Sequence, residues 1–356
     1  MKSGKLLLLA IVAIVLVALA IRSNHQQQTA PPSSIGKRLL PGLVLDSVSR
    51  VEIAHTGAPI AIVRKQDTWT VQNLFDYPAD LSKLQSALLA LSGMKVGEVA
   101  RGVNIDTNAT LVDLQGASGK PLATLRLGST PSAAADRAGS RRPQGRYVAV
   151  AGDPQVYLVK EPLSEFDGAP RDWANRQLLS LSSSDIQSIE LSAPTSTVLT
   201  LVRDGNAWKI DGLSTNEELD TGKSYGVESA LCYLTFSDVA DPKLNDATTG
   251  LNAPGMYHIK LKNGDQYTAR IGSANATGDR YLRLEAQLAP PGTNATAQAE
   301  YATHKADLEQ KFNKWTYLVA SSTAENMLLK RADLIKPKAP ATGDTASTST
   351  PVAPNP

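Results

Sequence analysis

Four arginines lie close together in a segment rich in Gly, Ser and Pro: Arg137, Arg141, Arg142 and Arg146. A guanidinium group binds phosphate and carboxylate oxygens through two parallel hydrogen bonds. The surrounding residue types are typical of a loop, and loops often carry binding sites. We therefore predict an anion-binding loop here, with lipid head groups or anionic glycans as candidate ligands. The alternative is a polar loop whose charges only keep it soluble.

The other residues that could do chemistry are better explained by structure. The segment Thr221–Ser224 ends like a phosphate-binding loop, but the first glycine of that motif is replaced by Glu217. Cys232 lies in an apolar run and is expected to be a small buried hydrophobe. His55 and His258 have no carboxylates at a metal-ligand spacing. We expect no catalytic residues, no metal, no cofactor and no enzymatic activity, with an enzyme of unknown class kept only as a third hypothesis.

The composition excludes several classes of protein. The chain has 356 residues, of which 42% are hydrophobic, so wholesale disorder is excluded. The 36 Lys and Arg residues nearly balance the 34 Asp and Glu residues, and the net charge of +2 argues against nucleic acid as a partner. A single cysteine excludes an intramolecular disulfide framework.

The body of the chain is predicted to be an internal repeat, because eight short motifs recur in the same order. The pairs are Val51–Ile53 with Ile189–Leu191, Ile60–Arg64 with Leu199–Arg203, Trp69–Val71 with Trp208–Ile210, Ser86–Leu88 with Ser229–Leu231, Val99–Ala100 with Val239–Ala240, Leu127–Ser129 with Ile271–Ser273, Arg146–Val148 with Arg280–Leu282 and Tyr157–Val159 with Tyr317–Val319. Insertions near 130–144 in the first copy and 286–313 in the second explain the changing offset. We assign the first repeat to 38–185 and the second to 186–336. Trp69 and Trp208, at equivalent positions, are expected to pack in the core of each copy.

Each copy reads as a β-rich unit with one main amphipathic helix. Leu81, Leu84, Leu88 and Leu91 recur at helical spacing between Asp80, a candidate N-cap, and Gly93, a candidate stop. Val227, Leu231 and Leu234 form the matching face in the second copy. Alternating or apolar runs predict strands at 48–54, 59–64, 68–72, 110–115, 122–127, 146–151 and 156–159. The predicted fold class is α+β, with two tandem copies after an N-terminal membrane anchor.

The two ends of the chain have a different character from the body. Sixteen consecutive apolar residues, Leu6–Ile21, follow two lysines, so residues 1–22 are predicted to be a signal-anchor or a cleaved signal peptide. The charge asymmetry favours a cytoplasmic N-terminus, which would place the body outside the cytoplasm. Residues 23–37 are expected to form a flexible linker. Residues 337–356, rich in Pro, Ala and Thr, are expected to form a disordered tail.

The order of several motifs resembles the domain-of-unknown-function 4340 family. These motifs are Leu39–Leu43, Val51–Ile53, Trp69–Val71, Tyr77–Asp80 and Trp173–Leu179, and the resemblance covers roughly 38–335. Similar proteins are bacterial, carry an N-terminal membrane anchor and are often encoded near components of gliding-motility-type ABC transporters. The family has no established catalytic residues, so the resemblance assigns none to this sequence.

These observations predict a membrane-anchored, envelope-facing accessory or scaffold protein, auxiliary to an ABC-type transporter complex. Its partners would be the membrane, through the N-terminal helix, and the transporter subunits. We expect a single pass through the inner (cytoplasmic) membrane, with the body on the periplasmic or extracytoplasmic side. The alternative is an exported binding module for an anionic glycan or lipid.

Overall fold

The computed structural model describes residues 34–55, 57–105, 109–131, 145–194 and 197–338. Its backbone contacts divide the chain into two compact units. The first holds the residues up to Trp69 together with Asp80–Gly168, and the second holds Thr70–Ala79 together with the residues from Ala169 on. The fold is mixed α+β with large antiparallel sheets, as the sequence predicts.

The first sheet has nine strands within the described residues. Its strands are, in spatial order, β4 (Tyr77–Pro78), β3 (Thr68–Val71), β2 (Ile60–Lys65), β1 (Arg50–Ala54), β6 (Thr110–Gln115), β7 (Pro121–Leu127), β8 (Arg146–Val150), β9 (Val156–Val159) and β5 (Glu98–Val99). Neighbouring strands of this sheet pair antiparallel, as in β1 with β2 and with β6. Seven of these strands lie within two residues of the predicted ranges, because alternating burial follows the alternating sequence. The two-residue strands β4 and β5 carry no such pattern and were not predicted.

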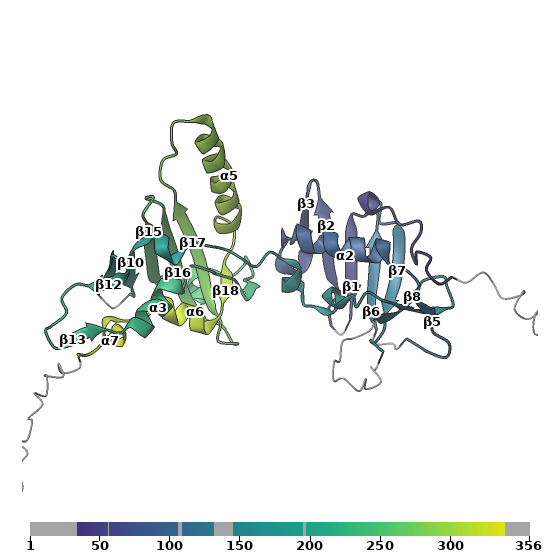
Figure 1. Cartoon of the computed structure of the whole chain (residues 1–356), viewed down its shortest axis with the longest axis horizontal. Helices are drawn as coiled ribbons and strands as arrows, with labels where there is room; N and C mark the ends of the chain where they lie inside the picture. Colours follow the sequence, from purple (N-terminus) through teal and green to yellow (C-terminus); the bar gives the residue numbers. More distant parts are fainter. Residues whose placement is uncertain (1–33, 56, 106–108, 132–144, 195–196, 339–356) are drawn as a thin grey trace, which may run out of the picture. The chain divides into compact units, whose positions relative to one another are not determined.

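Helix α2 (Leu81–Gly93) crosses the strands of the first sheet (Figure 1). The Asp80 side chain accepts a hydrogen bond from the backbone N–H of Lys83 at 3.0 Å, which confirms the predicted N-cap. Leu84, Leu88 and Leu91 are buried, whereas Leu81, the first residue of the helix, is half exposed. The predicted apolar face is therefore confirmed at three of its four positions.

The second sheet has eight strands within the described residues. They are, in spatial order, β12 (Ala207–Ile210), β11 (Leu199–Asp204), β10 (Ile186–Ser192), β15 (Gly255–Leu261), β16 (Gln266–Ala274), β17 (Arg280–Gln287), β18 (Tyr317–Val319) and β14 (Asp238–Val239). Strand for strand, this is the order of the first sheet from β3 to β5. The strand that lies beyond β3 at the edge of the first sheet, β4, has no counterpart in the second sheet.

The second unit contains further helices and a small sheet besides its large sheet. Helices are α3 (Thr221–Ser229), α4 (Asp246–Thr249), α5 (Ala295–Phe312), α6 (Ser321–Met327) and α7 (Arg331–Leu334), and a two-stranded sheet joins β13 (Glu217–Leu219) to β19 (Ile335–Pro337). Short 3-10 helices lie at Leu45–Ser47, Gln72–Leu74, Ser164–Asp167, Pro170–Trp173 and Ser183–Asp185 across the two units. Val227, Leu231 and Leu234 are all buried, as predicted, but the predicted helical face is only partly formed, because α3 ends at Ser229 and the two leucines lie in the turn and loop that follow it.

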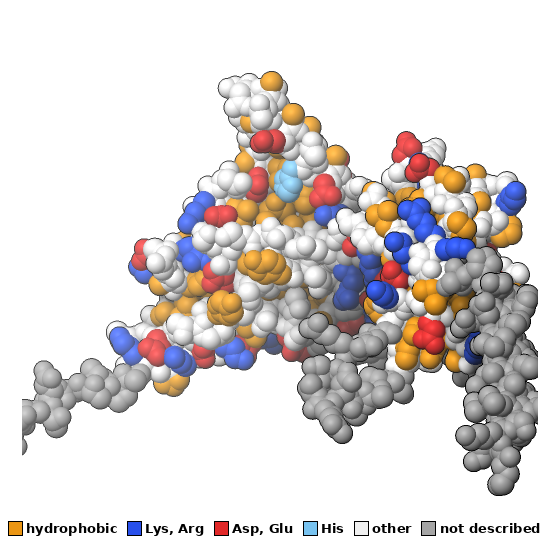
Figure 2. Space-filling view, turned by 45° about the vertical axis from the view of Figure 1, so that its right-hand side comes forward, with side chains coloured by type: hydrophobic (Ala, Val, Ile, Leu, Met, Phe, Trp, Pro, Cys, Tyr) orange, Lys and Arg blue, Asp and Glu red, His pale blue; other side chains and the backbone are white. Residues whose placement is uncertain are grey.

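Helix α5 occupies the insertion predicted near 286–313. It packs on β17 through its C-terminal half, where Leu308 and Phe312 are buried, and projects from the sheet (Figure 1). On the face seen in Figure 2 the projecting helix carries hydrophobic and acidic side chains side by side. The sequence analysis identified this segment only as an insertion, because few of its residues are strongly apolar.

The predicted ends of the chain fall largely outside the described residues. This holds for Leu6–Ile21 and for residues 339–356. Pro337 belongs to β19, and the backbone N–H of Lys338 donates to the carbonyl of Asn216 at 2.8 Å, so the ordered body extends two residues into the predicted tail. No helix in the described parts of the chain combines the length and apolar character needed to cross a bilayer.

Candidate functional site

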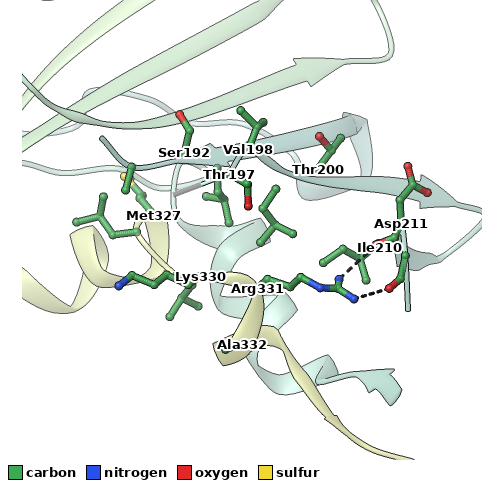
Figure 3. Close-up of a pocket in the computed structure, with 16 residues that line it drawn as sticks. Ser192, Thr197, Val198, Thr200, Ile210, Asp211, Met327, Lys330, Arg331 and Ala332 are labelled. Atoms are coloured by element: carbon green, nitrogen blue, oxygen red, sulfur yellow. Dashed lines mark hydrogen bonds between the residues drawn. The ribbon is translucent and has the colours of Figure 1, made fainter. Parts of the chain in front are cut away.

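A groove with a volume of about 480 Å³ opens at one end of β10, β11 and β12 in the second unit. The ends of these strands form one side, and the segment that links α6 to α7 forms the other (Figure 3). Its floor is apolar, because Leu191, Leu199, Ile210 and Met327 line it and are all buried. Val198, at the rim, is 64% exposed. The apolar surface that the described residues leave open is therefore mainly at the rim, on Val198, above a nearly covered apolar floor.

Polar groups stand around this apolar floor. The hydroxyl groups of Ser192, Thr197 and Thr200 come from the strand side, and Lys330 and Arg331 come from the helix side (Figure 3). The Lys330 side chain is exposed, and none of the described residues forms an ion pair with its ammonium group. The groove can therefore hold an apolar group with a hydrogen-bonding or anionic neighbour.

Arg331 ties α7 to the loop that follows β12. Its guanidinium donates to the backbone carbonyls of Asp211, at 3.3 Å, and Gly212, at 2.5 Å, and lies 3.4 Å from the carboxylate of Glu217. The pKa of Glu217 is lowered, chiefly by the hydrogen bond that its carboxylate accepts from the backbone N–H of Ser214, and further by Arg331. This guanidinium is thus committed to the protein itself, whereas Lys330 remains available to a ligand.

A second cluster fixes α3 to the strands beside the groove. Arg203 pairs with the Glu228 carboxylate and donates to the carbonyls of Ile186, at 2.9 Å, and Ser183, at 2.8 Å. The same carboxylate accepts from the Trp208 indole N–H at 2.9 Å, and the Arg203 guanidinium lies 4.4 Å from the centre of the Trp208 ring. All the strong donors in this cluster are satisfied within it, so its role is structural.

The two tryptophans of the repeat motif differ from the expectation of full core packing. Trp69 in β3 and Trp208 in β12 are each half-buried. Trp208 belongs to the outermost strand of its sheet, and its ring packs against a charged pair rather than between apolar layers. We therefore expect each of these indoles to stabilise the fold less than a fully buried indole would.

The segment that resembles a phosphate-binding loop forms the first turn of α3. Its helix terminus already has an anionic partner, because the Asp220 carboxylate accepts from the backbone N–H groups of Gly222, at 2.9 Å, and Lys223, at 3.2 Å. The Lys223 side chain is exposed. The geometry agrees with the structural interpretation of this motif.

Cys232 is buried, as predicted, and its thiol donates to the Glu228 carbonyl at 3.4 Å. Burial, and then the nearby Glu228 carboxylate, raise the pKa of the thiol to about 11. Such a thiol is protonated near neutral pH and is a poor nucleophile. His258 lies in β15, where its Nδ1 is 2.8 Å from the Thr268 hydroxyl. Within the described residues, no three His, Cys, Asp or Glu side chains come together as a metal site.

Arg146 differs from its predicted role as a free anion-binding group. Its side chain is buried and forms two hydrogen bonds of 2.8 Å with the Asp167 carboxylate. It also donates to the carbonyls of Gly128, at 2.8 Å, and Leu163, at 2.9 Å. These four hydrogen bonds engage all three nitrogens of the guanidinium, because β8 begins at Arg146 and turns its side chain inward. The other three members of the predicted loop, Arg137, Arg141 and Arg142, lie outside the described residues.

The sequence analysis did not find the groove. Its lining comes from four separate stretches between residues 191 and 332, and none of them carries a chemical motif. The one signal available was the pair Lys330–Arg331 immediately after the apolar run Met327–Leu329.

Comparison with known proteins identifies one family. The family model described as "Domain of unknown function (DUF4340)" matches residues 69–254, which is more than half of the chain. The matched residues include α2, α3 and parts of the two large sheets. No curated protein and no solved structure matches the chain. The resemblance to this family is therefore confirmed, and the chain belongs to the DUF4340 family.

Proposed function

We propose that this chain is an envelope-facing accessory or scaffold protein that acts by binding another protein. The observation that carries the proposal is the groove of the second unit, where the exposed Val198 lies at the rim of an apolar floor and none of the described residues pairs with the Lys330 ammonium. Protein-binding surfaces combine an apolar centre with a polar rim in this way. The largely buried titratable groups Arg203, Glu228 and Cys232 of the same unit are engaged in structural contacts.

The cellular setting of the proposal comes from the sequence. The apolar run Leu6–Ile21 behind two lysines supports a single anchor in the inner membrane with the body on its outer side. The resemblance to the family implies an ABC-type transporter complex as the partner. We take transporter subunits as the first candidates for what the groove binds.

We also infer that the body arose by duplication of one unit. The two sheets share one strand order from β3 to β5 and from β12 to β14. Equivalent arginines make equivalent bonds, since Arg146 donates to the carbonyl of Gly128 and Arg280 donates to that of Gly272. The groove and the projecting α5 belong to the second unit, so we place the partner-binding role there.

The proposal is tested by cross-linking and affinity purification of the full chain from the membranes of its native cell. Ala332→Trp fills the groove from its exposed rim, and Ala302→Trp places the same side chain on exposed α5 as a matched control. We expect transporter subunits to be recovered with the parent and with Ala302→Trp, and to be depleted at least about tenfold with Ala332→Trp. Retention of polysaccharide or lipid with no protein partner would contradict the proposal.

A further inference from the structure

We propose that the outer edge of β12 binds an extended segment of a partner protein as an added antiparallel strand, with an apolar–acidic–apolar pattern facing Trp208, Lys209 and Ile210. This deepens the proposed function, because it rests on the partner being a protein and names the chemistry of the segment that docks.

The register of the β11–β12 hairpin shows which backbone groups are open. Asp204 pairs with Ala207 across a two-residue turn, and Val202 pairs with Lys209. In an antiparallel hairpin these pairs exchange hydrogen bonds, and the residues between them point their N–H and C=O groups outward. The outward residues of β12 are therefore Trp208 and Ile210. Apart from the pairing of β11 with β12, none of the described residues forms a backbone hydrogen bond with Trp208 or Ile210.

The first sheet shows what kind of element covers this edge. Its equivalent strand, β3, is flanked by β4, with Thr70 opposite Pro78 and Val71 opposite Tyr77. The second sheet has the same strand order but ends at β12. The corresponding segment, β13, lies near β12 and hydrogen-bonds to β19 instead.

The loop that leads from β12 to β13 is one residue longer than the loop that leads from β3 to β4. Residues 72–76 connect β3 to β4, whereas residues 211–216 connect β12 to β13. Because side chains alternate along a strand, one additional residue shifts the register by one position. The result is an edge of the second sheet that lacks its short covering strand.

The side chains of β12 define the chemistry of the added strand. Trp208 and Ile210 share one face, where Ile210 also lines the apolar groove, so a partner side chain on this face contacts apolar surface. Lys209 points to the opposite face, and its side chain is 70% exposed, although it forms an ion pair with the Asp204 carboxylate, which is also exposed. An acidic partner residue opposite Lys209 complements its charge.

The same pattern argues against a second copy of this chain as the occupant. A two-fold pairing that uses both outward residues would place Trp208 opposite the partner's Ile210, and therefore two Lys209 side chains opposite each other. Like charges directly opposite on one face of a sheet are destabilising. A different protein with an acidic residue at this position avoids that repulsion.

The test uses the full chain in detergent micelles and a displayed library of random eight-residue peptides. We expect enrichment of apolar–acidic–apolar peptides, and slower amide exchange at Trp208 and Ile210 when a selected peptide is bound. In an added strand, alternate backbone N–H groups of the peptide point toward β12 and away from it. Methylating the nitrogens that point toward β12 should abolish binding, and methylating the others should leave binding unchanged.

Lys209→Glu should weaken binding about tenfold or more and shift the selected peptides toward basic residues. Lys260→Glu is the matched control, since Lys260 is also exposed on a strand of the same sheet, and it should bind like the parent. Binding without protection of the β12 amides, no enriched pattern, or equal loss in both variants would overturn the proposal. Protection of these amides in a self-associated chain without peptide would assign the edge to a second copy instead. These outcomes do not depend on membrane topology or on recovery of transporter subunits.

Discussion

An ion pair between a buried guanidinium and a half-exposed carboxylate responds unequally to loss of either partner. The Arg146 side chain is 7% exposed and that of Asp167 is 49% exposed. If the arginine is removed, water can solvate the remaining carboxylate. If the carboxylate is removed, a charged guanidinium stays buried with only two carbonyl acceptors, which is the costlier state.

We therefore predict that Asp167→Ala lowers the free energy of unfolding by about 3 kcal/mol. Arg146→Met, which keeps most of the side-chain volume, should cost about 1–2 kcal/mol through the carbonyls that lose their donor. Urea unfolding of the two variants and the double variant measures both values. Equal costs, or a larger cost for Arg146→Met, would contradict this account of the pair.

The thiol of Cys232 provides a second residue-scale prediction. Because burial raises its pKa to about 11, the folded protein holds the thiol proton at pH values where the unfolded chain loses it. The stability from this group is complete below a pH of about 8.5 and is lost as the pH rises toward 11. Alkylation by iodoacetamide at pH 8 should therefore be slow in the folded chain and fast in urea. Cys232→Ser is the blank, and rapid labelling of the folded parent would refute the prediction.

At the scale of elements, α2 and α3, the helices that follow equivalent strands in the two units, each begin at an aspartate that caps them. Asp80 accepts from one backbone N–H of α2, and Asp220 accepts from two of α3. Asp→Ala at either position should cost about 1 kcal/mol, because the first-turn N–H groups lose their acceptor. Asp→Ser, which keeps an acceptor, should cost only a fraction of that. Thermal unfolding of the four variants checks this, and an alanine variant as stable as the serine variant would show that the cap is not formed.

The elements also show which local sequence patterns were sufficient to predict where a strand or helix begins and ends. The strands β6 and β9 have their predicted bounds, since alternation of apolar and polar residues reports burial on one face. The cap at Asp80 and the end of α2 at Gly93 were predicted from residue type alone. By contrast, β13 consists of Glu-Glu-Leu and has no strand pattern; it forms because β19, more than 100 residues later, lies beside it.

At the scale of the whole molecule, the sequence predicts a topology that can be tested directly. Alkaline phosphatase fused after Lys338, the last described residue, should be active, because Leu6–Ile21 would carry the body across the membrane. A reporter that works only in the cytoplasm, fused at the same position, should be inactive. The reverse pair of results would place the body inside the cell and remove the cellular setting of the proposed function.

Sequence alone determined the α+β class, the approximate bounds of seven strands of the first sheet and of helix α2, and membership of the family. These properties are written in short windows, where periodicity, caps and turns reflect the immediate environment of each residue. Only the tertiary structure decided the properties that depend on distant neighbours. It buried Arg146 against Asp167, assembled the groove from four stretches of chain, and left β12 without a covering strand. A guanidinium, an apolar side chain or a strand edge becomes available or engaged only through what packs against it, and spacing along the chain does not specify that partner.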